Sequence, residues 1–497
     1  MNRIVSLADN SVVYEVAKVT PLSHAVQLSE RFSNQIYLKR EDEQSVHSFK
    51  LRGAYQKMFS LSTSKRQKGV VASSAGNHAQ GVALAAQKLK LRAVIVMPKS
   101  TPKIKVEAVQ RLGGEVVLHG DIYDDAYQHA KKLEAEQDLN FIHPYDDMDV
   151  IAGQATVGKE VLEQMQDVEL VFVPVGGGGL IAGIASYIKH HCPKVKIIGV
   201  EPKDSPTLYE ALKNNRITVL EDVGRFADGV AVKQVGKKTF KIASELVDEV
   251  VLVSNDEICA AIKDIYEDVR SVAEPAGALA TAGVKKYIND NNLKGNRIVS
   301  VISGANVNFD RLRYIAERAD LGELTEAIIA VTIPERAGSF LEFCRHLGEH
   351  SVTEFNYRHA GDKQAHIFVG VGLSDGESEK RALIDNLSKS FEVNDMSDNS
   401  MAKTHIRYMI GGRASADNEV IYRFEFPERP GALLKFLEKI GTRWSISLFH
   451  YRNHGADFGR VLIGLQASNI VELESRFDEI GYYYQSESDN QAYQYFL

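Results

Sequence analysis

Cysteine and tryptophan are scarce in this chain of 497 residues, which has three cysteines and one tryptophan. Cys192, Cys259 and Cys344 are far apart and odd in number, and none is flanked by residues that would mark a nucleophile. This pattern excludes a disulfide framework and any CxxC site, and it is typical of proteins in a reducing cytosol. We therefore expect a cytoplasmic protein.

Long apolar runs and an excess of positive charge are also missing. No stretch is long and apolar enough to span a bilayer, so we expect no membrane partner. The N-terminus, MNRIVSLADNSVVYEV, lacks the charged start, long apolar stretch and small-residue cleavage site of a secretion signal. The formal net charge of -7 argues against a nucleic-acid partner, because general nucleic-acid binders are basic.

What is present is typical of a globular protein, with 44% hydrophobic and 25% charged residues. The length predicts two or more domains. From about residue 35 to 310, short β-branched runs alternate with longer helix-like segments such as HAQGVALAAQKLK and KVEAVQRLGG. This pattern predicts an α/β domain whose mainly parallel sheet binds ligands at the carboxyl ends of its strands. The runs are QIYLK, GVVAS, AVIVMP, EVVLHG, ELVFVPV, VKIIGV and RIVSVIS.

An internal repeat follows a charged helical segment at residues 311–327. AVTIPERAGSFLEFCRHLG and YRFEFPERPGALLKFLEKIG align with Pro334 and Pro427 at a spacing of 93 residues. Each copy indicates a strand, a Pro-Glu-Arg turn and an amphipathic helix, followed by the strand HIFVGVGL or GRVLIGLQA. Two such α+β units predict a separate C-terminal region. The expected domains are residues 1–322, 323–400 and 401–497.

Four motifs lie at or just after the ends of predicted strands in the first region: Lys50, SSAGNHAQG, four consecutive glycines, and Ser303. Backbone N–H groups at a helix start suit a carboxylate, and glycines let the backbone wrap closely around a phosphate. The glycine run matches neither G-x-G-x-x-G nor G-x-x-x-x-G-K-[ST], so no nucleotide site is favoured. A reactive amine, a carboxylate site, a phosphate site and a hydroxyl together indicate pyridoxal phosphate.

In this order and spacing, SFKLRGA, SSAGNHAQG, VGGGGL and SGAN resemble the fold-type II pyridoxal-phosphate enzymes, which have a tryptophan synthase β-like catalytic domain. They are most similar to the serine/threonine dehydratases. With VTIPERAGSFLEFC…SVTEFNYR, the resemblance covers nearly the whole chain and extends to the biosynthetic threonine deaminase (threonine ammonia-lyase) branch. It implies a catalytic domain, two ACT-like regulatory subdomains, and conversion of L-threonine to 2-oxobutanoate and ammonia, the first step of isoleucine biosynthesis. L-Serine is implied as a secondary substrate.

The resemblance also implies roles for individual residues. Lys50 is expected to hold the cofactor covalently and to remove the Cα proton, Asn77 to lie beside the ring hydroxyl, and Ser303 to lie at the pyridine nitrogen. Phe49 is expected to flank the ring, and Arg52 and Glu274 match positions near the site but equally indicate structural ion pairs. The implied phosphate site is Gly176, Gly177, Gly178, Gly179 and Leu180, and the implied substrate carboxylate site is Ser74, Ala75, Gly76, Asn77 and His78.

One substitution helps to separate this chain from its nearest alternatives. Serine racemases of this fold carry a second serine where this chain has Ala75, so we expect dehydration rather than racemisation. For His78, backbone or packing duty is favoured over proton transfer. Some relatives bind a divalent cation through a glutamate, which Glu201 matches, and a nearby acid, at whose position this chain has Thr207. Asp204 and Asp228 are close in sequence, but Glu201 is equally typical of a strand end, so no metal site is assigned.

The C-terminal repeats resemble ACT-like regulatory domains, which implies inhibition by isoleucine, an opposing effect of valine, and a homotetramer. The alternative is that the repeats only hold the oligomer together. Two rival functions remain: another dehydratase, racemase or β-replacement enzyme of this fold, or an amino-acid-binding regulator on an inactive scaffold. The apolar candidates for effector contacts, which are equally typical of core, are Phe355, Tyr357, Phe449 and Tyr451.

Overall fold

Two compact units make up the computed structural model, Met1–Phe309 and Asp310–Leu497. Each unit is described by itself. The structure describes residues 1–496 except 335–338, 349, 351, 358–363, 409–417, 428–435, 437–438, 441–442, 445 and 453–457.

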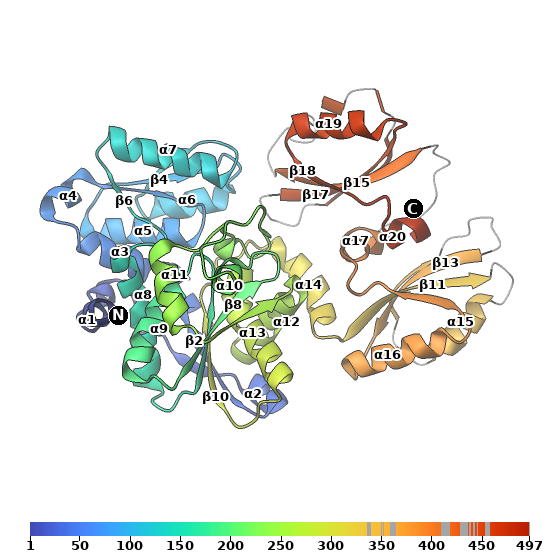
Figure 1. Ribbon diagram of the computed structural model, residues 1–497, viewed down its shortest axis with the longest axis horizontal. Helices are drawn as coiled ribbons and strands as arrows, with labels where there is room; N and C mark the ends of the chain where they lie inside the picture. The colour runs from blue at the N-terminus through green and yellow to red at the C-terminus, as the bar shows by residue number, and fades with distance from the viewer. Residues whose placement is uncertain are drawn as a thin grey trace. The chain divides into compact units, whose positions relative to one another are not determined.

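The larger sheet of the first unit has the strand order β1-β2-β10-β7-β8-β9 (Figure 1). Its neighbouring strands pair in parallel, except that β1 is antiparallel to β2. All five residues of β7 are buried, as expected for a strand covered on both faces. The strands are β1 (Leu22–His24), β2 (Gln35–Arg40), β7 (Leu170–Pro174), β8 (Lys196–Pro202), β9 (Glu249–Val253) and β10 (Arg297–Ile302).

A second, smaller sheet in this unit is entirely parallel and has the order β5-β4-β3-β6. Helices α5, α6 and α7 surround it in Figure 1. Its core joins strand residues such as Ile95 to alanines of α5, which let the helix approach the sheet closely. The strands are β3 (Val70–Ser73), β4 (Ala93–Met97), β5 (Glu115–Leu118) and β6 (Asn140–Phe141).

Helices connect nearly all of these strands. The core of the larger sheet packs the apolar residues of β7 and β10 against α9, including Val171, Ile184 and Val299. The helices are α1 (Asn2–Asp9), α2 (Val26–Phe32), α3 (Lys50–Phe59), α4 (Thr63–Lys68), α5 (Asn77–Leu89), α6 (Lys103–Arg111), α7 (Tyr123–Glu136), α8 (Met148–Gln164), α9 (Gly179–His191), α10 (Thr207–Lys213), α11 (Lys237–Leu246), α12 (Asn255–Val269) and α13 (Pro275–Asn291), with 3₁₀ turns η1 (Val13–Glu15), η2 (Glu41–Glu43) and η3 (Asp228–Val230).

All seven predicted strands of this unit are present, as β2, β3, β4, β5, β7, β8 and β10, and the two quoted helical segments fall on α5 and α6. Strands β1, β6 and β9 were not predicted. The division of the strands between two sheets was not predicted either, because apolar periodicity locates a strand without specifying its neighbour.

The second unit begins with α14 (Arg311–Gly322) and contains two four-stranded antiparallel sheets. Their orders are β12-β13-β11-β14 and β16-β17-β15-β18, which is the same arrangement twice. The register shifts between Val352 and Glu354 in one sheet, and between Ile446 and Leu448 in the other. The predicted duplication is therefore confirmed. The strands are β11 (Glu326–Pro334), β12 (Val352–Tyr357), β13 (Gln364–Gly372), β14 (Glu392–Asp395), β15 (Glu419–Pro427), β16 (Ile446–Arg452), β17 (Phe458–Gln466) and β18 (Tyr483–Ser486).

Both sheets of the second unit are buried on two faces. Ile329 of β11 points into a cluster with α15 and α16, whereas its neighbour Ile328 joins a different cluster, which shows the two-residue period of a strand. That second cluster also contains Ile421 and Leu462 of the other repeat, so the repeats share a core. The helices are α15 (Ser339–Leu347), α16 (Gly376–Leu387), α17 (Ser400–Thr404), α19 (Ile470–Ile480) and α20 (Gln491–Phe496), with η4 (Ile406–Tyr408).

Several sequence-based candidates lie at or beyond the limits of this description. Pro334 ends β11 and Pro427 ends β15, but the Glu-Arg pairs of both turns lie outside the described residues. The four aromatic candidates for effector contacts lie on β12 and β16, and their side chains are outside the description.

Candidate active site

The four predicted motifs all follow strands of the first unit. Lys50 is the first residue of α3, which comes after β2, and Asn77 is the first residue of α5, which comes after β3. The glycine run joins β7 to α9, and Ser303 directly follows β10. Since β2, β10 and β7 are parallel neighbours, three of the motifs share one edge of the larger sheet.

Hydrogen bonds and close contacts bring the fourth motif to the same place. The N–H of Phe49 donates to the carbonyl of Ser303 at 3.3 Å, and Ser48 forms a β-bridge with Gly304. A Cβ added to Gly81 of α5 would lie 2.9 Å from the backbone of Lys50, so α5 packs directly on the start of α3. The structure therefore brings Lys50, the SSAGNHAQG helix and the SGAN loop together.

The Lys50 amine is the most chemically distinctive group of the site. Burial lowers its pKa to about 8, and the negative charge of Glu274 opposes part of that shift. Its Nζ donates to the carbonyl of Pro144 at 3.1 Å and lies 5.2 Å from the ring centre of Phe49. A lysine with this pKa has an appreciable neutral fraction near neutral pH, and the neutral amine is the nucleophile.

The Asn77 amide is held at both ends. Its Nδ2 donates to Oε1 of Glu274 at 2.5 Å, and its Oδ1 accepts a hydrogen bond from Nδ2 of Asn306 at 2.7 Å. Glu274 is the N-cap residue of α13, and its N–H donates to the carbonyl of Gly304 at 3.1 Å. Sequence reasoning did not select Asn306, although it is the last residue of the SGAN motif. Glu274 was selected as either a site residue or an ion-pair partner, and its bond to Asn77 lies at the site.

The glycine run is tightly enclosed. A Cβ on Gly176 would lie 2.9 Å from the Cα of Val230, and one on Gly177 would lie 2.3 Å from ring atoms of Tyr145. Gly178 has φ +90°, a conformation that favours glycine, and it is the N-cap residue of α9. The loop thus presents backbone at the positive end of a 13-residue helix, which is the geometry that binds a phosphate.

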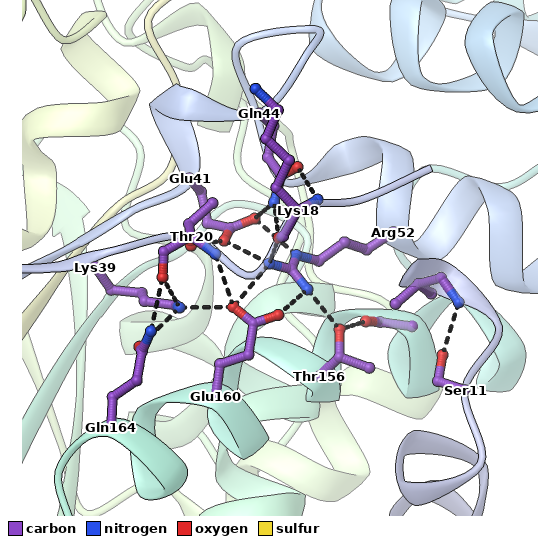
Figure 2. Close-up of polar contacts among 12 residues, drawn as sticks. Ser11, Lys18, Thr20, Lys39, Glu41, Gln44, Arg52, Thr156, Glu160 and Gln164 are labelled. Carbon is purple, nitrogen blue, oxygen red and sulfur yellow. Dashed lines mark hydrogen bonds and ion pairs between the residues drawn. The ribbon is translucent and has the colours of Figure 1, made fainter. Parts of the chain in front are cut away.

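A buried cluster of four charged side chains links α3 to β2, η2 and α8. The Arg52 guanidinium makes bidentate contacts with Glu41, at 2.8 Å through both Nε and Nη2, and with Glu160, at 2.6 Å through Nη1 and 3.0 Å through Nη2 (Figure 2). Lys39 Nζ donates to Glu160 Oε2 at 2.6 Å, and all four side chains are fully buried. Arg52, two residues along the chain from Lys50, is therefore part of a structural ion-pair network.

Ser74 and His78 flank Asn77 and have local partners. Ser74 Oγ accepts a hydrogen bond from the N–H of Gly76 at 3.2 Å, which orders the turn before α5. The His78 ring is buried, and its Nε2 lies 2.8 Å from the carbonyl of Ile142. Burial and the positive charge of Lys50 lower the His78 pKa to about 3, so the ring is neutral and its Nε2–H donates to that carbonyl. The ring is thus engaged by a backbone carbonyl, and a packing role for His78 stays a prediction.

Glu201 is fully engaged by protein donors. Its carboxylate accepts hydrogen bonds from Thr207 Oγ1 at 2.8 Å, Leu208 N at 2.8 Å and Tyr209 N at 2.9 Å. Burial raises the pKa of Glu201 to about 7. Within the described parts of the chain, no group of three or more His, Cys, Asp or Glu side chains is placed to hold a metal ion. In the same residues, no helix is both long enough and apolar enough to cross a membrane.

Family models match nearly the whole chain. The model of the pyridoxal-phosphate dependent enzymes matches residues 13–304. The chain belongs to this family. A model of the C-terminal regulatory domain of threonine dehydratase matches residues 317–406 and 411–497. The family membership confirms the enzyme class and the cofactor expected from the sequence.

Curated relatives are similar over their full length. The chain is 54% identical to the biosynthetic L-threonine dehydratase of Pasteurella multocida over 493 residues, which cover 98% of this chain and 96% of the relative. It is 52% identical to the enzyme of the same name from Escherichia coli, over 98% of this chain and 95% of the relative. The similarity therefore includes both the catalytic and the C-terminal regions.

Solved structures match a little under two thirds of the chain. The processed form of threonine deaminase isoform 2 from Solanum lycopersicum superposes with a TM-score of 0.64 and 48% identity, over 64% of this chain and 88% of that one. Maize serine racemase superposes with a TM-score of 0.59 and 30% identity, over 63% and 95%. The fold-type II class predicted from the motifs is confirmed.

Proposed function

We propose that this chain is a pyridoxal-phosphate-dependent threonine ammonia-lyase that converts L-threonine to 2-oxobutanoate and ammonia, at the first step of L-isoleucine biosynthesis. The observation that carries the proposal is the partly buried Lys50 amine, with its pKa lowered to about 8, on the same sheet edge as the enclosed glycine loop. The names of the relatives support threonine as the substrate.

The site residues fit the cofactor. When bound, pyridoxal phosphate supplies an aldehyde for an amine and a ring that takes up electrons from Cα. Lys50 would hold that aldehyde through its amine, and its Nζ would be the atom that accepts the Cα proton of the substrate. The N–H groups of Gly176, Gly177, Gly178, Gly179 and Leu180 hold the phosphate, supported by the dipole of α9.

The other residues position the ring and the substrate. Asn77 donates to the ring hydroxyl. Ser303, a hydroxyl where an acid would protonate the ring nitrogen, leaves that nitrogen largely neutral, which favours elimination of the β-hydroxyl over transamination. Ser74 binds the substrate carboxylate together with the backbone of Ala75, Gly76, Asn77 and His78, at the start of α5.

A threonine-saturation curve tests the activity directly. Purified protein with pyridoxal phosphate should release 2-oxobutanoate from L-threonine, with a higher kcat/KM than for L-serine. Lys50→Ala should abolish this release and leave no adduct that borohydride can trap, while circular dichroism stays unchanged. Release at the normal rate by Lys50→Ala would refute the assigned mechanism.

A racemase or serine dehydratase is the second candidate, favoured by the likeness to maize serine racemase. Ala75 argues against racemisation, because its side chain has no proton to return to the opposite face of Cα. Chiral analysis after incubation with L-serine separates the two activities: D-serine accumulation supports a racemase, and its absence with ammonia release supports the lyase.

The C-terminal repeats are proposed to bind isoleucine, which lowers activity, and valine, which opposes that effect. Their duplicated architecture and the match to a threonine dehydratase regulatory domain support this role. Isoleucine must bind the less active state more tightly for this to occur. Repeating the saturation curve with isoleucine, and then with both amino acids, tests the regulation, and an unchanged curve contradicts it.

Assembly, location and domain limits are proposed as well. A homotetramer is proposed on the likeness to the threonine dehydratases, and sedimentation measures it. A cytoplasmic location is supported by the small number and wide spacing of the cysteines in the sequence. Domain limits of 1–322, 323–400 and 401–497 are proposed from the sequence pattern. The separation of the two repeated sheets supports the second limit, whereas the boundary between the two compact units lies before α14, at Phe309.

A further inference from the structure

The SGAN loop contacts the segments that carry His47, Asn77 and Glu274. Gly304 O accepts from the N–H of Glu274, and the N–H of Ala305 donates to the carbonyl of His47 at 2.9 Å. A Cβ on Gly304 would lie 2.7 Å from Glu274 Oε1 and 3.2 Å from Asn77 Nδ2. The loop therefore lies directly against the Asn77–Glu274 pair, and its last residue, Asn306, completes a chain of hydrogen bonds there.

The chain of hydrogen bonds has a direction. Asn306 Nδ2 donates to two acceptors, the backbone carbonyl of Val46 at 2.8 Å and Oδ1 of Asn77 at 2.7 Å. Asn77 Nδ2 then donates to the carboxylate of Glu274. The two outer groups, a carbonyl and a carboxylate, only accept hydrogen bonds. A rotated Asn77 amide would set its carbonyl against Glu274 and its N–H against the Asn306 N–H, which are both unfavourable contacts.

We propose that Asn306 is a positioning residue for the reaction: it fixes the Asn77 amide so that its N–H side, and not its carbonyl, faces Glu274 and the ring oxygen of the cofactor. This inference rests on the proposed function, in which Asn77 binds that oxygen. One hydrogen of Asn77 Nδ2 binds Glu274, and the second serves the cofactor. A carbonyl in the same place would repel the ring oxygen.

The test measures pyridoxal phosphate binding to the cofactor-free protein by absorbance, together with the pH titration of the visible band. Asn77→Ala and Asn306→Ala should each weaken binding, on the order of tenfold, and shift the titration in the same direction. Because Asn306 acts through Asn77, the double variant should match Asn77→Ala alone. Loss in the double variant equal to the product of the single losses would overturn the inference.

Asn306→Asp separates a positioning role from a purely structural one, because the two roles predict opposite rankings of the Asp and Ala variants. Aspartate has nearly the shape of asparagine but has no donor when ionised, so it draws the Asn77 N–H toward itself and turns the Asn77 carbonyl toward the cofactor. Asn306→Asp should therefore bind the cofactor more weakly than Asn306→Ala. A milder effect of the shape-matched aspartate would indicate packing alone and contradict the inference.

Asn34 is a matched control. It is likewise an asparagine whose side-chain amide donates to two carbonyls, those of Phe32 at 2.7 Å and Leu293 at 2.9 Å. It precedes β2, at the opposite end of the strand from Lys50. Asn34→Ala should lose stability with cofactor binding unchanged.

The outcomes separate this inference from the proposed function. Wild-type protein that never binds pyridoxal phosphate would refute both. Wild-type binding with a weakened Asn77→Ala and an unchanged Asn306→Ala would refute the inference alone. An unchanged Asn77→Ala would remove Asn77 from the site and overturn the inference, while threonine turnover would still stand.

Discussion

Replacing Glu160 by glutamine should destabilise the catalytic unit strongly, because Glu160 is the shared acceptor of the buried charge cluster (Figure 2). Its carboxylate accepts from Arg52, from Lys39 and, at 3.3 Å, from the N–H of Thr20. The four charges of the cluster are balanced, with Arg52 and Lys39 against Glu41 and Glu160. Glu160→Gln leaves the fully buried cluster with one positive charge that no negative charge balances.

The expected loss in the free energy of unfolding is about 3–5 kcal/mol, the usual cost of removing one partner of a buried ion pair. It should be smaller at alkaline pH. Burial already lowers the pKa of Lys39, and Glu160 opposes that shift, so its removal lowers the pKa further. Since the folded state then releases this proton at a lower pH than the unfolded state, stability rises with pH and the deficit shrinks.

Glu115→Gln is the matched control. Glu115 also makes a bidentate pair with an arginine, Arg92, at 2.9 and 2.8 Å, but its side chain is 54% exposed. Its loss should be below about 1 kcal/mol and should diminish further in salt. Urea unfolding followed by circular dichroism measures both variants, and the buried-cluster interpretation is wrong if Glu160→Gln loses no more stability than Glu115→Gln.

Three further predictions concern the site itself. In the cofactor-free protein, the rate of Lys50 acylation should rise with pH around a midpoint of about 8. Glu274→Gln should lower that midpoint, because the carboxylate of Glu274 stabilises the Lys50 ammonium. An unchanged midpoint would contradict this effect of Glu274 on Lys50. Gly177→Ala should reduce pyridoxal phosphate affinity because its Cβ would meet the Tyr145 ring at 2.3 Å, and adding Tyr145→Ala should restore part of it; no restoration would exclude this clash as the cause. Burial raises the pKa of Glu201 to about 7 in the folded state, so the free energy of unfolding should fall as pH rises from about 4.5 to 7, because the unfolded state loses this proton first. Urea unfolding of Glu201→Gln at several pH values tests this, and the same dependence on pH as in the wild type would refute it.

Local patterns of apolar residues in the sequence predicted much of the fold. Runs such as AVIVMP and ELVFVPV become buried parallel strands β4 and β7 because continuous β-branched residues suit a sheet covered on both faces. The repeat at Pro334 and Pro427 predicted two equivalent units because both copies keep the same apolar spacing. Short strands such as β6, with two residues, contain too few positions for a period to be detected.

The candidate site was predicted as a set of residues, but its contacts were not. Lys50, the glycine run and Ser303 were selected because each residue type has a specific chemistry after a strand. Asn306 was missed because asparagines are common in loops, and only its hydrogen bond to Asn77, 229 residues away in the chain, marks it.

By itself the sequence determined the elements, the repeat and the reactive residue types, because apolar periodicity and backbone preferences act over a few neighbouring residues. The tertiary structure alone decided which sheet each strand joins, and it made Arg52 part of a buried cluster with Glu160, 108 residues away. Hydrogen bonds and ion pairs act over a few ångströms in space, so the partner of a buried polar group depends on which distant segments the fold brings beside it.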